Sequence, residues 1–262
     1  MEQIVTGISD GKTLPAEVLQ QIIAKTDGVP LFVEEMTKAI LESGQLKAPD
    51  GHYELVGALS TLTIPATLQD SLMARLDCLV TAKGIAQIGA IIGRQFAYDL
   101  LQAVSQVDEM MLQHELGRLV EAEIVYQRGL PPQAYYFFKH ALIRDSAYES
   151  LLKSTRQHYH QRIAQVLETQ FPETAETQPE LVAHHYTEAG LTEKAVHYWY
   201  QAGQSTAKRS AHAEAIAHLR TGLELLKIVP ETPERVQREV DLLIAIGAVS
   251  YTHLTLPTIL RV

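Results

Sequence analysis

The sequence predicts a mainly α fold: an N-terminal helical segment, a winged-helix domain with one β-hairpin, and an antiparallel helical array. Apolar residues recur at helical spacing through most of the chain. Two β-like runs, 123–127 and 134–138, flank the turn sequence RGLPP at residues 128–132. Beyond residue 141, alanine and aromatic positions resemble those of tetratricopeptide (TPR) helix pairs.

The composition limits the functional class. The 262 residues include 22 Lys and Arg against 31 Asp and Glu, for a net charge of −9, which disfavours general binding to nucleic acid or acidic membranes. The single cysteine, Cys78, excludes an internal disulfide framework and a cysteine-based zinc site. Because there is no long apolar run and no basic-then-apolar leader, we expect a soluble, cytoplasmic protein.

Residues 7–13, GISDGKT, look like a phosphate-binding loop. Only three residues separate the two glycines, whereas the loop requires four, and the run Ile4-Val5 is too short for a convincing strand. Pro15 follows at once. We therefore interpret residues 7–13 as a turn before a helix, although a small ATPase with Lys12 in a working loop remains an alternative.

Two helices are expected next, over residues 15–25 and 30–41. Gly28 breaks the first, and Pro30 suits the first position of the second, where its missing N–H costs nothing. Gly44 ends the second helix. Residues 45–63 are a polar connection containing Gly and Pro, so we place the end of a first domain at residue 62.

Residues 63–150 have the order of a winged helix. Helical patterns at 66–79, 83–92, 96–104 and 111–120, the last begun by Asp108, precede the β-hairpin. Many winged helices bind DNA, but the helix before this hairpin carries Arg118 as its one basic side chain other than histidine. We therefore favour a structural or regulatory role over DNA binding.

His140 directly follows the hairpin and begins a helix. The unpaired N–H groups of a helix N-terminus favour an anion such as phosphate. A histidine at this position has two interpretations, a phosphate contact or a packed aromatic ring.

Beyond residue 141 the chain reads as helices with short breaks, and we assign residues 151–248 to the helical repeats. We expect helices at 141–152, 155–169, 179–189, 193–208, 213–227 and 233–248, with a polar connection at 171–178. The pattern Trp199-x2-Ala202-Gly203 followed by Ala215-x3-Leu219 fits a helix-pair repeat. Arrays of this kind bind peptides or neighbouring domains, so we expect a protein partner here.

Adjacent histidines could suggest a metal site, namely His158 with His160 and His184 with His185. Neighbours at these spacings point in different directions on a helix, so we interpret them as solvated or half-packed side chains and predict no metal site. No nucleophile triad or carboxylate pair has a local signature, and we predict no catalytic residue.

Residues 249–258, VSYTHLTLPT, interrupt the helical pattern. They match one reading frame of the transposase adapter used in short-read sequencing libraries. We therefore interpret residues 249–262 as adapter read-through that cuts the last helix short, and exclude them from the fold prediction.

Three segments together carry a resemblance: DGVPLFVEE at 27–35, IPATL at 64–68 and FKHALIRD at 138–145. Over residues 10–248 the chain resembles the bacterial signal-transduction ATPases of the STAND class, which are AAA-like modules followed by helical repeats. It is most similar to those fused to a class III adenylate/guanylate cyclase, and LuxR-type regulators share its middle part.

The resemblance implies that residues 1–62 are the helical lid of such an ATPase. Gly28 and Pro30 would match the Gly-x-Pro motif that lies against adenine, and His140 would match the histidine that contacts the ADP phosphate. Lys139 and Ala141 depart from the Met and Asp that flank this histidine in the stricter motif.

In that family, the phosphate loop, the Mg-binding acid and any cyclase residues would precede Met1. We therefore expect a fragment that neither hydrolyses ATP nor binds ATP or ADP tightly, and whose partners are the ATPase core, an output domain and a protein on the repeats. The alternative is a stand-alone helical-repeat scaffold or a winged-helix transcriptional regulator.

Overall fold

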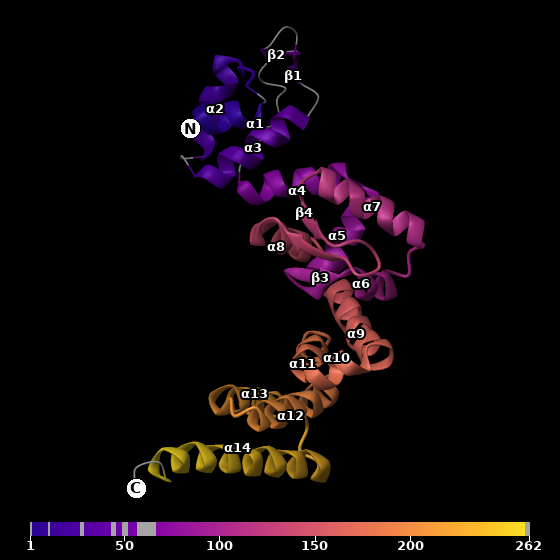
Figure 1. The fold of residues 1–262 in the computed structure, drawn as a ribbon, viewed down its shortest axis with the longest axis vertical. Coiled ribbons are helices and arrows are strands. Elements are labelled where there is room, and N and C mark those ends of the chain that lie inside the picture. Colours follow the sequence, from indigo (N-terminus) through magenta and orange to yellow (C-terminus); the bar gives the residue numbers. More distant parts are fainter. Residues whose placement is uncertain are drawn as a thin grey trace. The chain divides into compact units, whose positions relative to one another are not determined.

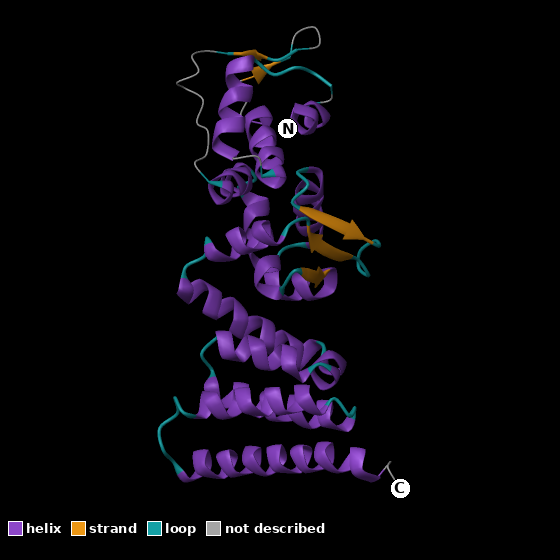
Figure 2. Ribbon diagram, turned by 90° about the vertical axis from the view of Figure 1, so that its left-hand side faces the viewer, coloured by secondary structure: helices purple, strands orange, loops and turns teal. Residues whose placement is uncertain are grey.

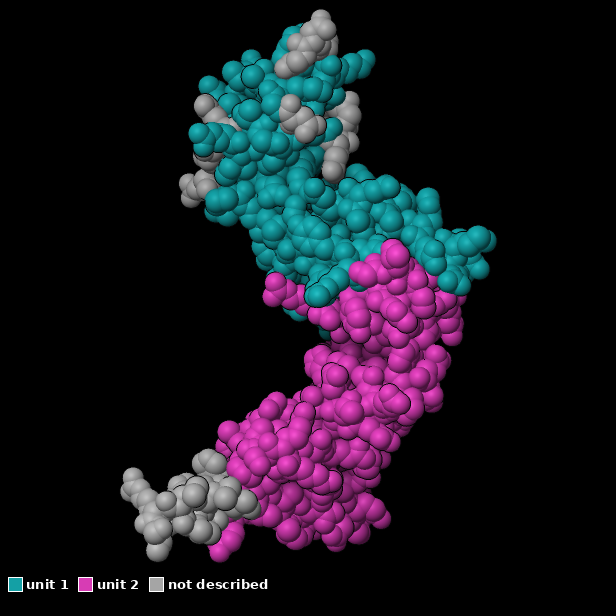
Figure 3. All heavy atoms as spheres, viewed as in Figure 1, with its two compact units in different colours: residues 1–90, 108–128, 136–150 teal, residues 91–107, 129–135, 151–262 magenta. Residues whose placement is uncertain are grey.

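The computed structural model describes residues 2–9, 11–26, 29–42, 46–48, 52–56 and 67–259. The predicted mainly α fold with a small β component is confirmed, because helices dominate and the strands of the described residues form two small sheets (Figures 1 and 2). The chain divides into two compact units (Figure 3). Unit 1 holds residues 1–90, 108–128 and 136–150, and unit 2 holds 91–107, 129–135 and 151–262.

Unit 1 begins with three helices, α1 (Glu2–Ile8), α2 (Ala16–Thr26) and α3 (Pro30–Glu42). Apolar residues of α2 and α3 lie three or four positions apart and form one buried cluster, comprising Val18 and Ile22 with Val33, Met36 and Ile40. This spacing places them on one face of each helix. Pro30 occupies the first turn of α3, as predicted.

Two segments of unit 1 differ from the expectation. Residues 2–8 form helix α1, which the sequence did not predict and which includes Gly7, because Val5 and the half-buried Ile4 pack in the cluster beside α3. Tertiary packing of this kind stabilises helices too short to persist alone. The expected connection contains a short antiparallel hairpin, β1 (Leu46–Lys47) with β2 (Glu54–Leu55).

The remaining elements of unit 1 are short helices and a hairpin: α4 (Leu68–Cys78), α5 (Thr81–Ile92), α7 (Glu109–Glu121), β4 (Val125–Arg128), β5 (Tyr135–Phe138) and α8 (Ala141–Glu149). The last two residues of α5 and the first residue of β5 are assigned to unit 2. Thr67 and Asp70 form a capping box at the start of α4, and Asp108 caps α7. Helix α4 packs against α3 and α8. Because α4 contacts both α3 and α8, the N-terminal helices and the helix after the hairpin belong to one packed body.

Unit 2 begins with β3 (Gln95–Ala97) and α6 (Tyr98–Ser105), where the sequence predicted only a helix from residue 96. A strand of three residues is too short to show a two-residue period. The Tyr98 N–H donates to the Ala134 carbonyl at 2.9 Å, which extends the strand pairing. The strand order in this sheet is β3-β5-β4.

The rest of unit 2 is helical: α9 (Lys153–Gln170), α10 (Pro172–Thr177), α11 (Pro179–Glu188), α12 (Thr192–Lys208), α13 (His212–Leu226) and α14 (Pro233–Ile259). Helix α10 lies in the expected polar connection, where Pro172 begins a turn and Ala175 is buried. Gly190 ends α11 with a φ of 75°, the left-handed conformation that glycine adopts easily.

Residues of the predicted helix-pair pattern lie at the contact between α12 and α13. A Cβ atom added to Gly203 would lie 2.5 Å from the Leu219 side chain, closer than such contacts allow. Ala202 and Ala215 are fully buried. Small side chains therefore permit the close approach of these two helices.

Helix α14 runs to Ile259, whereas the sequence predicted its end at residue 248. Residues 249–256 contain neither glycine nor proline, and a helix continues where nothing breaks it. The helix ends two residues after Pro257. Among the described residues, no helix combines the length and apolar character needed to cross a membrane.

Candidate functional site

Two of the three predicted nucleotide residues, Pro30 and His140, lie at the starts of helices in unit 1. Gly28 lies outside the described residues. Pro30 is exposed at the first position of α3, and His140 is half-buried immediately before α8. The His140 backbone is extended, with φ −135° and ψ 144°, as expected of the residue that precedes a helix.

The structure brings His140 to α3. One potential ligand atom each from Glu34, Glu35 and His140 lie within 4.8 Å of one another. Glu34 is four residues, about one turn, after Pro30 on α3. Helix α3 therefore carries both Pro30, a predicted nucleotide contact, and the glutamates that lie close to His140.

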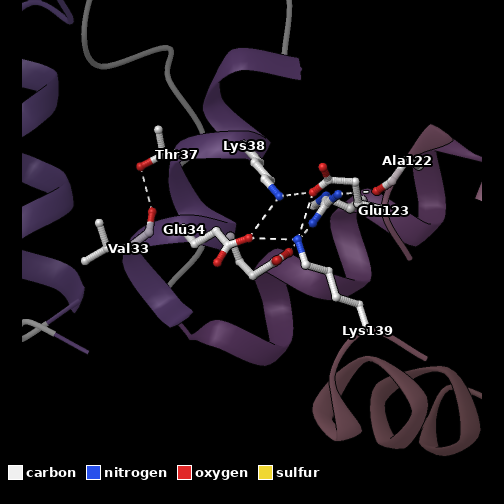
Figure 4. A network of polar contacts seen from close by, with 9 residues as sticks. Val33, Glu34, Thr37, Lys38, Ala122, Glu123 and Lys139 are labelled. Atoms are coloured by element: carbon white, nitrogen blue, oxygen red, sulfur yellow. Dashed lines mark hydrogen bonds and ion pairs between the residues drawn. The ribbon is translucent and has the colours of Figure 1, made fainter. Parts of the chain in front are cut away.

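Ion pairs extend this contact into a charged cluster, which we define as Glu34, Glu35, Lys38, Arg75, Glu123, Lys139 and His140. Figure 4 shows Lys38 and Lys139 pointing toward Glu34 and Glu123 from different elements. Lys139 Nζ lies 2.9 Å from Glu34 Oε1 and 2.8 Å from Glu123 Oε2. Lys38 Nζ lies 3.0 Å from Glu34 Oε1 and also contacts Glu123 Oε2. Two lysines thus bridge two carboxylates.

The contacts shift the ionisation of these groups. Hydrogen bonds from Lys139 and then Lys38 lower the pKa of Glu123 to about 2. Burial alone would raise the pKa of Glu34, but the same lysines outweigh it and the pKa falls below its ordinary value. Burial would lower the pKa of Lys139, yet hydrogen bonds with Glu123 and Glu34 raise it. All three groups are therefore charged at neutral pH.

A buried ion pair joins α3 to α4 in the same cluster. Arg75 Nη1 donates to Glu35 Oε2, and Arg75 Nη2 donates to the Ala122 carbonyl at 2.5 Å. The side chains of Arg75 and Glu35 are only 3% and 0% exposed. A charge at this depth needs its partner, because desolvation leaves an isolated ion very unfavourable.

The sequence predicted His140 but missed the residues around it. Arg75 did carry a signal, because it lies three residues after Leu72 and just before Leu76 on the apolar face of its helix. A charged residue on such a face indicates a buried partner. Glu35 was not identifiable as that partner, since the two residues are 40 positions apart.

In unit 2 the histidine prediction is wrong for two residues. His160 of α9 and His185 of α11 are buried, and their Nδ1 atoms lie 2.9 Å apart. The pKa of His160 falls to about 4, mainly because the ring is buried and also because His184 and Arg156 lie nearby. The pKa of His185 is held well below its ordinary value, again mainly by burial and also by His160 and His184. Their pairing joins different helices, so spacing within each helix did not reveal it.

A groove lies between α12 and α14 of unit 2. It has a volume of about 350 Å³. Its lining mixes polar, charged and apolar side chains: Val196, His197, Tyr200, Gln201, Gln204, Arg238, Asp241 and Leu242. Such a lining suits a segment of polypeptide better than a purely apolar ligand.

Comparison with known proteins gives one informative similarity. No protein-family model matches the chain. It is 28% identical over 223 residues to the uncharacterized protein R02095 of Rhizobium meliloti strain 1021. The aligned region is 85% of this chain and 21% of the relative, so the chain matches about a fifth of that longer protein.

Proposed function

We propose that this chain is the lid, winged-helix and repeat part of a cytoplasmic signal-transduction ATPase of the STAND type. In the intact protein, the lid and winged helix close over ADP or ATP, while the helical repeats bind a protein partner or signal. By itself the chain is not catalytic. Gly28, Pro30 and His140 are the proposed nucleotide contacts, and Mg²⁺ is held by residues outside this chain.

The contact between α3 and His140 carries this proposal. Pro30 begins the helix whose second turn meets His140, and the ion pairs of Lys139 and Arg75 attach that helix to the segments around it. A lid attached in this way would move with the segment carrying His140. Nucleotide contacts on the lid and on the segment carrying His140 would then favour a closed state. Release of the nucleotide would favour a different, open state.

The similarity to a protein several times longer also supports a multidomain parent. The position of Gly7 inside α1 supports an inactive fragment, because a phosphate-binding loop follows a strand. The groove between α12 and α14 supports the partner-binding role of the repeats. It equally suits a stand-alone scaffold, which would bind its partner in the same way with or without nucleotide.

The nucleotide role is tested in the full-length protein encoded at the source locus. Replacing His140 with alanine is expected to speed ADP release by about tenfold to a hundredfold, because a hydrogen bond to a charged group contributes about 1.5–3 kcal/mol. Release of a fluorescent ADP analogue measures this rate. His114→Ala, at an exposed position of α7, is the matched control. Equal ADP release from both variants would remove His140 from the proposed site.

A further inference from the structure

We propose that Glu34, Glu35 and His140 form a binding site for a divalent transition-metal ion such as Zn²⁺. This site goes beyond the proposed function, which assigns His140 to a nucleotide phosphate. The three side chains each offer a ligand atom, and these atoms lie within 4.8 Å of one another. One imidazole nitrogen and two carboxylate oxygens are a ligand set that Zn²⁺ accepts, with a fourth position left for water.

Two buried atoms in this group lack a hydrogen-bond partner among the residues that the structure describes. They are Glu35 Oε1 and His140 Nε2. The Glu35 side chain is completely buried, so bulk solvent does not reach that oxygen. A buried carboxylate oxygen and a buried ring nitrogen without partners are unfavourable. A metal ion bound to both atoms would satisfy them together.

The cations of the cluster hold the two carboxylates in place. Arg75 contacts Glu35 through Oε2, which leaves Oε1 as the oxygen available to an ion. Lys38 and Lys139 both contact Glu34 through Oε1, which leaves Oε2 as the Glu34 oxygen that neither lysine contacts. Contacts of this kind around metal ligands fix their orientation and raise metal affinity.

The charge of the cluster permits a divalent ion. Glu34, Glu35 and Glu123 balance Lys38, Lys139 and Arg75, so the ion meets no net positive charge. The imidazole favours Zn²⁺, Co²⁺ or Ni²⁺ over Mg²⁺ and Ca²⁺, which prefer oxygen ligands alone. The buried histidines of unit 2 are less suitable, since the Nδ1 atoms of His160 and His185 are hydrogen-bonded to each other.

The test uses the purified 262-residue chain after removal of metals with a chelator. Calorimetric titration with Zn²⁺ is expected to give one ion per chain, and Co²⁺ is expected to show visible absorption that changes in His140→Ala. Glu34→Gln and His140→Ala are each expected to weaken binding by about tenfold or more. Matched controls are Glu121→Gln and His114→Ala, both at exposed positions of α7, which should bind as the unsubstituted chain does.

Three outcomes would overturn the site. The first is a folded, unsubstituted chain that binds no Zn²⁺. The second is equal Zn²⁺ affinity in the unsubstituted chain and the half-buried Glu34→Gln variant, which decides the matter even where His140→Ala fails to fold. The third is a Co²⁺ spectrum that His140→Ala leaves unchanged. Because nucleotide is absent, none of these outcomes bears on ADP release by the full-length protein.

Discussion

Replacing Arg75 with methionine is expected to lower the free energy of unfolding by about 3–5 kcal/mol, the cost of breaking a buried ion pair by removing one partner. The change leaves the completely buried Glu35 carboxylate without its counter-charge. It also removes the hydrogen bond to the Ala122 carbonyl. Urea denaturation of the 262-residue chain, followed by circular dichroism, measures the loss.

Two variants separate this explanation from a general sensitivity to substitution. Arg128→Met removes an exposed arginine from β4 and should change stability by less than about 0.5 kcal/mol. The double variant Glu35→Leu with Arg75→Met removes both buried charges and should recover most of the loss, since apolar replacements of buried ion pairs are commonly tolerated. A double variant less stable than Arg75→Met alone would show that the ion pair is not the cause.

Acid is expected to destabilise unit 2 through its buried histidine pair. The pKa of His160 is lowered from 6.5 to about 4, mainly by burial and also by the nearby His184 and Arg156. The unfolded chain therefore takes up protons before the folded chain does, and stability falls as the pH drops from about 6.5 to about 4. For His160 alone the difference in pKa corresponds to about 3 kcal/mol, with His185 adding in the same direction.

Denaturation at several pH values between 7.5 and 4 tests this effect. The double variant His160→Gln with His185→Leu should show a much flatter dependence in that window. His158→Ala, an exposed histidine on the same helix α9, should lose stability with acid as the unsubstituted chain does. A pH dependence unchanged in the double variant would mean that other groups cause the acid sensitivity.

Local signals in the sequence predicted the helices well where the chain carries clear boundaries. Pro30 at the start of α3, Asp108 as the cap of α7 and Gly190 after α11 all act within one turn of the backbone they affect. The apolar residues of α2 and α3 that recur at helical spacing likewise form a buried cluster. These features depend on neighbours in sequence, so they are visible without a structure.

Short elements were not predictable in this way. Helix α1 has seven residues, strand β3 has three, and helix α10 has six. Too few residues are present in each to show a period, and packing against distant segments stabilises them. The continuation of α14 beyond residue 248 has a different reason, since no glycine or proline between residues 249 and 256 breaks the helix.

The site shows a similar division between local and distant information. His140 was identifiable because it follows the hairpin and begins a helix. Its neighbours Glu34 and Glu35 lie more than a hundred positions away in the sequence. Arg75 and the buried histidine pair also acquire their partners only through folding. The type of residue at a site could thus be predicted, whereas the pairing that sets its chemistry could not.

The most direct test of the central claim is the nucleotide sequence of the source locus across both ends of this reading frame. A fragment of a STAND-type ATPase predicts an upstream frame that encodes a strand followed by Gly-x4-Gly-Lys-Ser/Thr, and helical repeats that continue past residue 248. It also predicts that the codons for residues 249–262 are absent from the locus. A start codon at Met1 preceded by an in-frame stop, together with codons for residues 249–262, would contradict the account and favour a stand-alone scaffold.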